Sequence, residues 1–295
     1  MHPADVVELT SSTHPDESLW YANDSPQFAW TTAVPGSASG YSCIIDHDPA
    51  TIPPAVVSQT GSAASFSDVA DGVWYFHVRA RDTAGSWGHA SHYAVRIDLT
   101  PPVTSDTADG KWHNTTVAVT LTPNDAASGT SGGLATTEYA IDGLTWLPGT
   151  LVTLTADPLT HTTDKLHTIS YWSTDVIGNQ EATKTCTVGI DTVKPTTRAP
   201  VTASVRRGMT ATLKYRVGDA APCAGTVTVT IKIRNRAGNV VRTIPAVVKT
   251  ADPLVTYTAK FRCRLAKGTY RFSVYAVDPP GNHQLKAASN KLVVR

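Results

Sequence analysis

Trp74-Tyr75-Phe76-His77-Val78-Arg79-Ala80-Arg81-Asp82-Thr83-Ala84-Gly85-Ser86 joins an alternating segment to a turn, and the chain repeats this plan twice. The matching turns are Asp175-Val176-Ile177-Gly178-Asn179 and Asp278-Pro279-Pro280-Gly281-Asn282. Successive turn Asp residues lie 93 and 103 positions apart, about the length of one β-sandwich. Repetition at this period indicates an array of similar modules.

Each segment before a turn alternates in polarity. Steps of two back from the turn Asp reach one mainly apolar face: Ala80, Val78, Phe76 and Trp74; Ser173, Tyr171, Ile169 and His167; Ala276, Val274, Phe272 and Tyr270. A period of two indicates a half-buried strand, and the Asp and Gly then favour a turn. The apolar run after each turn is the expected hairpin partner: Tyr93, Val95 and Ile97; Cys186, Val188 and Ile190; Leu292 and Val294.

The module boundaries follow from a second repeat, in which a strand ends on Ile-Asp and proline follows. It occurs at Ile97-Asp98 before Pro101 and at Ile190-Asp191 before Pro195. Proline cannot donate to a strand ladder, and short proline-bearing linkers are stiff. We therefore predict an all-β chain of three consecutive immunoglobulin-like or fibronectin III-like antiparallel β-sandwiches, 1–99, 100–192 and 193–295, in an extended rod.

Several motifs carry a resemblance to known modules. Trp30, Tyr41 and Gly72-Val73-Trp74-Tyr75-Phe76 resemble a bacterial fibronectin type III-like module. Thr137-Glu138-Tyr139-Ala140-Ile141-Asp142-Gly143 is similar to a hairpin of Ig-like repeats in large bacterial surface proteins. The turn Asn235-Arg236-Ala237-Gly238-Asn239 resembles C-terminal Ig-like modules of secreted bacterial proteins, including cell-wall proteases and glycosidases. The resemblance implies a secreted or cell-surface location, but this fold hosts many unrelated roles.

Charge and hydropathy exclude two kinds of partner. The net charge is +1, and basic residues in the last third are interleaved with apolar ones. We interpret them as the solvated face of strands and predict no nucleic-acid binding. No apolar run approaches the roughly 20 residues of a membrane helix, so membrane insertion is not expected. The segment 1–5 does not resemble a signal peptide, and we expect any export signal to lie upstream.

The chain has four cysteines and no Cys-x-x-Cys spacing. Cys223 and Cys263 fall in the last module, and export favours disulfides, so we predict a bridge between them. Closing a loop of that length would contribute about 4 kcal/mol in the chain-entropy model. Cys43 and Cys186 fall in different modules and are interpreted as small buried thiols.

Catalytic motifs are missing from the sequence. Gly36-Ser37-Ala38-Ser39-Gly40 does not have the spacing of a hydrolase nucleophile elbow, and no helix is expected after it. The sequence contains neither a His-Glu-x-x-His motif nor a phosphate-binding glycine loop. We predict that the chain is not an enzyme and that it needs no cofactor.

Calcium is the one ion kept as an alternative, because it binds six to eight oxygens. The candidates are Asp46 and Asp48; Asn124 and Asp125 with the turn Ser128-Gly129; the repeated turn residues Asp82, Asp175 and Asp278; and Asp98 and Asp191, which end strands beside the linkers. Each place offers only one or two carboxylates. A role as turn former is the simpler interpretation of every one.

Aromatic side chains are the remaining candidates for ligand contact. Trp20, Tyr21, Trp87 and Trp146 lie near turns or strand ends, outside the regular alternating segments. Aromatic faces of this kind bind sugars or anchor a protein partner. Packing over the ends of the sandwiches is the competing interpretation.

The sequence leaves three hypotheses for the function of the chain. The leading hypothesis is a non-catalytic structural or adhesive array of a bacterial surface or secreted protein, which acts as spacer and binds a protein or polysaccharide surface. The second is an accessory region of a larger secreted hydrolase that binds carbohydrate or positions a catalytic domain. The third, an independent enzyme, would need a nucleophile–base pair or metal cluster that the sequence does not contain. The oligomeric state is left open.

Overall fold

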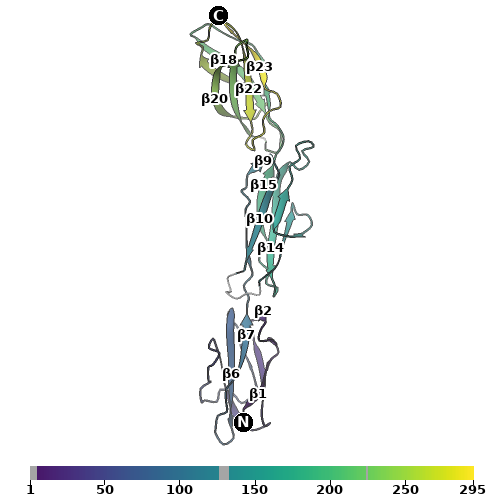
Figure 1. The fold of residues 1–295 in the computed structure, drawn as a ribbon, viewed down its shortest axis with the longest axis vertical. Coiled ribbons are helices and arrows are strands. Elements are labelled where there is room, and N and C mark those ends of the chain that lie inside the picture. The colour runs from purple at the N-terminus through teal and green to yellow at the C-terminus, as the bar shows by residue number, and fades with distance from the viewer. Residues whose placement is uncertain (1–4, 126–132, 224) are drawn as a thin grey trace.

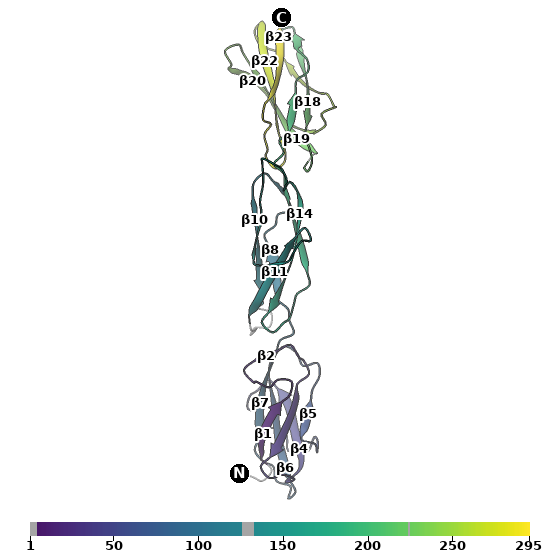
Figure 2. The same ribbon diagram turned by 90° about the vertical axis from the view of Figure 1, so that its right-hand side faces the viewer.

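The computed structural model describes residues 5–125, 133–223 and 225–295. Three β-sandwiches follow one another along a single long axis, and the two termini lie at opposite ends (Figure 1). The view turned by 90° shows the same line (Figure 2). We name residues 1–99 module 1, 100–192 module 2 and 193–295 module 3. Every sheet is formed within one of these ranges.

Module 1 pairs a three-stranded sheet with a four-stranded one. The first sheet has the order β1 (Val6–Ser11), β3 (Gln27–Thr32), β5 (Ala63–Ser65). The second has the order β2 (Trp20–Tyr21), β7 (Ser91–Ile97), β6 (Gly72–Asp82), β4 (Ala38–Asp46). Strand β2 runs parallel to β7, and all other pairs are antiparallel.

Modules 2 and 3 repeat this plan with one more edge strand each. In module 2 the three-stranded sheet has the order β13 (Leu151–Leu154), β10 (Val117–Asn124), β8 (Val103–Asp106). The five-stranded sheet has the order β12 (Leu147–Pro148), β11 (Leu134–Ile141), β14 (Lys165–Asp175), β15 (Lys184–Ile190), β9 (Trp112–His113). In module 3 the three-stranded sheet has the order β16 (Thr196–Arg198), β18 (Thr210–Gly218), β21 (Tyr257–Arg262). The five-stranded sheet has the order β17 (Ala203–Val205), β23 (Ala288–Val294), β22 (Gly268–Val277), β19 (Thr226–Arg234), β20 (Val240–Thr250).

The predicted alternation is confirmed in the strands that precede the repeated turns. Phe76, Ile169 and Phe272 are fully buried at equivalent places in β6, β14 and β22. In module 2 the same face also buries Ser173, whose hydroxyl lies 2.7 Å from that of Thr104 and 2.8 Å from that of Thr137. Each module has its own apolar core between its two sheets. The all-β sandwich prediction is therefore correct.

The three repeated turns share one geometry. The main-chain N–H of Asp82, Asp175 and Asp278 donates to the carbonyl four residues on, at 2.8, 3.1 and 3.2 Å. The fourth residue of each turn is a glycine with φ near +100°, where only glycine is unstrained. Strands β6, β14 and β22 run toward the N-terminal end of the rod, so each turn faces that end (Figure 1). The turns of modules 2 and 3 therefore face the preceding module.

The predicted disulfide is wrong, because all four cysteines are free thiols. Cys263 donates its main-chain N–H to Met209, just before β18 begins, whereas Cys223 follows the end of β18. Nine strand residues extend about 30 Å, and a disulfide requires Cα atoms within about 7 Å. Residence in one module does not bring the two thiols together. Cys43 and Cys186 are half-buried thiols.

Within residues 5–125, 133–223 and 225–295, no helix is long and apolar enough to cross a lipid bilayer.

Candidate functional sites at the module junctions and on the surface

The strand-ending residues Asp98 and Asp191 are fully buried at the two junctions. In both, Oδ1 accepts a hydrogen bond from the main chain two residues on, at Thr100 (3.1 Å) and Val193 (2.9 Å). The main-chain N–H of Asp98 donates to Tyr21, and that of Asp191 donates to His113. These bonds hold each linker against the module that it leaves.

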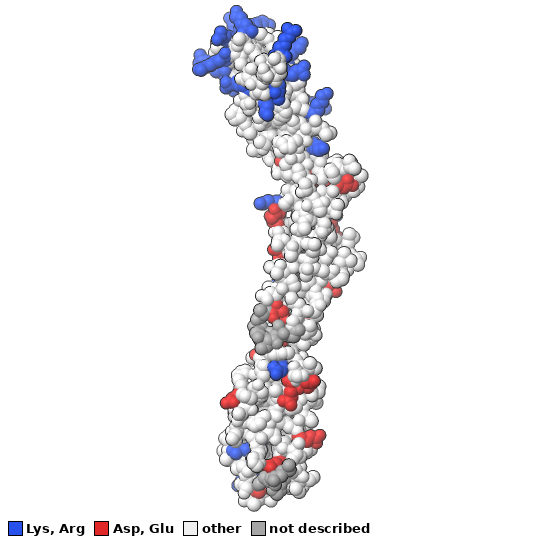
Figure 3. Space-filling view, viewed as in Figure 1, with Lys and Arg blue, Asp and Glu red and all other residues white. Residues whose placement is uncertain are grey.

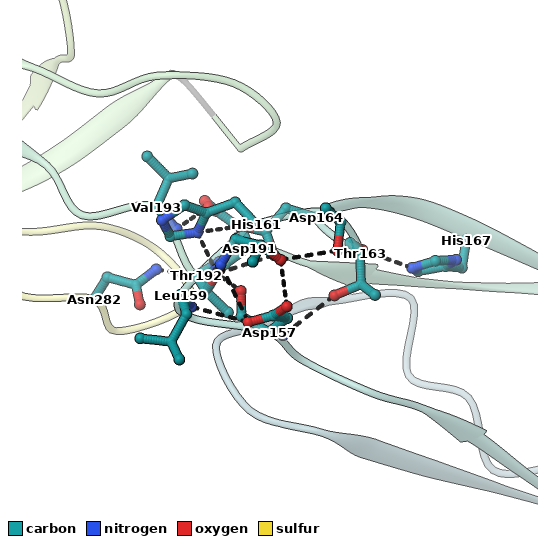
Figure 4. Close-up of polar contacts among 12 residues, drawn as sticks. Asp157, Leu159, His161, Thr163, Asp164, His167, Asp191, Thr192, Val193 and Asn282 are labelled. Atoms are coloured by element: carbon teal, nitrogen blue, oxygen red, sulfur yellow. Dashed lines mark hydrogen bonds and ion pairs between the residues drawn. The ribbon is translucent and has the colours of Figure 1, made fainter.

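A second carboxylate of the preceding module holds the next linker residue. Asp71, just before β6, accepts from the main chain of Leu99 at 2.8 Å. Asp164, just before β14, accepts from the main chain of Thr192 at 2.8 Å. Figure 4 shows Thr192 enclosed by Asp164, Asp157 and His161 of the loop before β14, with its hydroxyl 2.6 Å from His161 Nδ1.

The following module reaches back over each linker through the last residue of its repeated turn. The side-chain amide of Asn179 donates to the carbonyl of Asp98 at 2.9 Å, and that of Asn282 donates to the carbonyl of Asp191 at 2.8 Å. In Figure 4, Asn282 enters from module 3 beside the linker. Module 1 has Ser86 at the equivalent place of its own turn. The linkers are therefore bonded from both sides.

Three carboxyl groups meet at each junction. Asp98, Asp125 and Asp175 bring one oxygen each within 4.8 Å of one another, as do Asp191, Asp219 and Asp278. The members come from equivalent places: the end of one module, the residue after β10 or β18, and the repeated turn. Sequence spacing gave no reason to group them, because two modules contribute to each set.

The second group has no basic partner among the described ion pairs. None of the described ion pairs includes Asp191, Asp219 or Asp278. Burial, together with the other carboxylates, raises the pKa of Asp191 to about 6 and that of Asp219 to about 7. Burial raises the pKa of Asp278 as well, and the pKa of the adjacent Cys223 thiol to about 11. Three acidic groups thus share one site at a cost in free energy.

The other calcium candidates act as turn formers. Asp46 accepts from the main chain of Asp48 at 2.9 Å, and Asp48 accepts from Ala50 at the same distance. Asp82 accepts from Ser86 at 2.8 Å. Asn124 ends β10, and the turn predicted at Ser128 and Gly129 lies outside the described residues.

Three of the four candidate aromatics are half-buried and packed against their own module. The Arg96 guanidinium lies 5.9 Å from the Trp20 ring centre, and the Arg79 guanidinium lies 4.9 Å from that of Trp87. Tyr21 packs edge-on against His14, with ring centres 4.8 Å apart. These contacts stabilise module 1.

Trp146 differs from the others, since 40% of it is exposed. Its ring centre lies 6.0 Å from that of Trp172, a half-buried residue of β14. The two indoles form an aromatic pair on the surface of module 2. The sequence indicates Trp146 as a candidate aromatic residue. It does not indicate that Trp172 lies beside it, because Trp172 stands 26 residues further along the chain.

Charge is segregated along the rod, with Lys and Arg gathered over module 3 (Figure 3). Residues 193–295 hold 19 of the 25 Lys and Arg residues and 3 of the 24 acidic ones, a net charge of +16. Residues 1–192 hold the other 6 and 21, a net charge of −15. The overall charge of +1 conceals this separation.

A basic hollow of about 500 Å³ lies at the C-terminal end of module 3. Arg234 and Arg236 line it from the β19–β20 turn, Tyr270 and Arg271 from β22, and Lys291 from β23. No Asp or Glu is among the described residues that line it. The volume is typical of small-ligand sites, and the cations suit an anionic group.

No protein-family model matches the sequence, and no curated protein matches it either. Solved structures match at low identity. The fibronectin(III)-like modules of Clostridium thermocellum CbhA are 12% identical over 65% of this chain and 94% of theirs (TM-score 0.36). Three domains of the bacteriophage RB49 Hoc protein are 12% identical over 98% and 99% (0.45). A tetra-tandem repeat of a large adhesion protein is 18% identical over 96% and 73% (0.33).

These likenesses are too distant to carry an argument about function. The strand order of the described residues defines the fold by itself: three times, a three-stranded sheet packs on a sheet whose last strand pairs in parallel with a short early strand. The chain is a tandem array of three immunoglobulin-like, fibronectin III-like β-sandwiches.

Proposed function

We propose that this chain is a non-catalytic spacer and binding array of a bacterial surface or secreted protein, in which module 3 contacts an anionic polysaccharide. The observation that carries the proposal is the separation of charge along a bonded rod, −15 over modules 1 and 2 and +16 over module 3. A strongly basic end favours encounter with anionic partners. Acidic modules are repelled by the same partner, so contact is confined to one end.

The rod supports the spacer part of the proposal. Each linker is held by Asp71 or Asp164 from one side and by Asn179 or Asn282 from the other. A spacer needs such junctions, because free linkers would let the modules fold back on one another.

The hollow at the end of module 3 supports an anionic sugar as the partner. Arg236, Arg271 and Lys291 provide exposed cations, while the half-buried ring of Tyr270 adds an apolar wall. Sugars combine apolar ring faces with polar edges, so an aromatic beside cations suits an acidic sugar unit.

The test is binding of the purified chain to immobilised heparin and polygalacturonate, with neutral dextran as reference. The double variant Arg236→Glu/Arg271→Glu should weaken binding by at least about tenfold, since two charge-assisted contacts are lost. The matched control is Lys214→Glu/Lys260→Glu, which removes the same charge from exposed positions of β18 and β21. The control should stay within about threefold of the parent chain.

Three outcomes would overturn the proposal. Equal losses in the two double variants would show diffuse attraction with no site at the hollow. Tighter binding of duplex DNA than of any polysaccharide would make nucleic acid the partner. Self-association of the chain that salt abolishes would show that module 3 docks on the acidic modules of a second copy.

A second candidate function rests on the Trp146–Trp172 pair. Neighbouring indoles with one ring well exposed offer a platform for a neutral sugar chain. In that case the array is an accessory carbohydrate-binding region of a larger secreted hydrolase, and module 2 makes the contact.

A further inference from the structure

We infer that each module junction is a binding site for a divalent cation, Ca²⁺, held by Asp98, Asp125 and Asp175 at the first junction and by Asp191, Asp219 and Asp278 at the second. The ion would join carboxylates of the preceding module to carboxylates of the following one. This goes beyond the proposed function, because it concerns how the rod is made rigid and not what it binds.

Buried oxygens without hydrogen-bond partners point to an ion at the second junction. Asp191 is fully buried and Asp278 is 5% exposed, yet Oδ2 of each has no hydrogen-bond partner among the residues that the structure describes. Oδ2 of Asp219 is likewise buried and has none. Leaving a buried carboxylate oxygen unsatisfied is costly, and a cation is the partner that three such oxygens share most readily.

The other oxygens of the same carboxylates are already used. Oδ1 of Asp191 accepts from Val193 at 2.9 Å, and Oδ1 of Asp278 accepts from Gly281 and Asn282 at 2.9 and 2.6 Å. These bonds fix the orientation of each carboxylate through its own turn. The Oδ2 atoms are therefore the ones left to meet a ligand.

The spacing of the oxygens fits Ca²⁺. One oxygen from each Asp lies within 4.8 Å of the others. Ca²⁺ binds oxygen at about 2.3–2.6 Å, so two ligands on opposite sides of it lie at most about 5 Å apart. Three carboxylates supply three of its usual six to eight ligands, and main-chain carbonyls or bound water would supply the others. Mg²⁺ requires shorter bonds and a regular octahedron, which favours Ca²⁺ here.

The first junction repeats the arrangement from equivalent residues. Asp98, Asp125 and Asp175 are 0, 8 and 2% exposed, and their oxygens meet the same 4.8 Å limit. Module 1 provides the internal contrast. Its turn has Asp82, but Ala33 follows β3 where the other modules have an acidic residue after the equivalent strand.

The first measurement is the number of Ca²⁺ ions bound by the full chain, by equilibrium dialysis and isothermal titration calorimetry. We expect two ions per chain, with Kd about 10⁻⁴–10⁻³ M as in extracellular modules. Asp175→Asn and Asp278→Asn should each remove one ion, and the double variant both. Asp82→Asn, in the equivalent turn of module 1, is the matched control and should still bind two.

The second measurement is the thermal midpoint of the same proteins in 5 mM CaCl₂, 5 mM MgCl₂ or EDTA. Ca²⁺ should raise the midpoint of the parent chain by roughly 5 °C, and Mg²⁺ by less. Asp219→Asn, at a half-buried position, serves if Asp278→Asn does not fold, and it should also lose one ion. No binding at 10 mM Ca²⁺, a stoichiometry unchanged by these variants, or tighter binding of Mg²⁺ would overturn the inference.

Discussion

The side-chain amide of Asn282 donates a 2.8 Å hydrogen bond to the main-chain carbonyl of Asp191, and so ties the repeated turn of module 3 to the last strand of module 2. Asn179 makes the same bond to Asp98 one module earlier, at 2.9 Å. The recurrence shows that the junctions are built to one plan. The direction of each module relative to the next depends on this plan.

The first prediction concerns these amides. Asn179→Ala and Asn282→Ala should each remove one cross-junction bond, worth about 0.5–1.5 kcal/mol, and loosen the rod. Small-angle X-ray scattering of the double variant should give a shorter mean maximum dimension than the parent chain. Asn239→Ala is the control, because Asn239 ends a turn of the same pattern inside module 3. A double variant with an unchanged scattering curve would show that the amides do not hold the junctions.

The second prediction concerns Gly189 in β15, which lies directly beneath the Trp112 ring. A Cβ at Gly189 would come within 2.4 Å of that ring. Gly189→Ala should therefore lower the free energy of unfolding by about 1–3 kcal/mol through overpacking. Gly61→Ala is the control, since its Cβ would meet nothing within 4 Å. Urea denaturation measures both, and a neutral Gly189→Ala would mean that Trp112 is free to move away.

The third prediction concerns the buried ring of His14 in module 1. Nε2 donates to the Asn23 carbonyl at 3.1 Å, Nδ1 lies 2.9 Å from the Thr13 hydroxyl, and burial lowers the pKa below the ordinary 6.5. Tyr21 packs against the ring, and Tyr93 donates to the His14 carbonyl. None of the described ion pairs includes His14.

A lowered pKa means that the folded state disfavours the charged ring, whereas the unfolded state takes up the proton near pH 6.5. The stability of module 1 should thus be complete above pH 6.5 and decline as the pH falls below it. Thermal unfolding between pH 7.5 and 5 measures this slope. His14→Gln should reduce this slope, and the remainder comes from His92, whose pKa is also lowered by burial. His113→Gln, at a half-buried site in module 2, should not change it. An unchanged or steeper slope in His14→Gln would contradict the prediction.

The fourth prediction separates aromatic residues that bind from aromatic residues that pack. Trp146→Ala should abolish any retention on insoluble neutral polysaccharide, and should destabilise module 2 less than Trp87→Ala destabilises module 1, because Trp146 is 40% exposed whereas Trp87 is half-buried. Trp87→Ala should lower the stability of module 1 by about 1 kcal/mol or more, because it loses the Arg79 contact and buried area, and should leave retention intact. Affinity electrophoresis and calorimetry provide the two readouts. Retention that survives Trp146→Ala would remove the second candidate function.

Local patterns were enough to predict the sandwiches. The alternation before Asp82, Asp175 and Asp278 and the glycine in each turn depend on neighbours within a few residues, so they can be read from the chain directly. The linkers at Ile97-Asp98 and Ile190-Asp191 were visible for the same reason. The charge separation was also present in the sequence, but a sum over the whole chain cancelled it.

The disulfide prediction was wrong because the sequence shows that the two cysteines belong to the same module but not where each one lies along the long axis of that module. Cys223 and Cys263 lie at opposite ends of β18, and only the strand geometry reveals that separation. The Trp146–Trp172 pair was missed for a related reason. Both tryptophans are present in the sequence, but their rings come together only because β11 pairs with β14 and the chain after β11 brings Trp146 beside Trp172.

By itself the sequence determined the period, the sandwich fold and the acidic residue that ends each of the first two modules. Only the tertiary structure decided that Asp191 meets Asp219 and Asp278, and that Asn282 reaches across to it. The physical reason is the separation along the chain between the residues that interact. Strand alternation and turn chemistry act between neighbours in the chain, whereas the junction forms where the end of one module and two separate loops of the next converge, up to 91 residues apart.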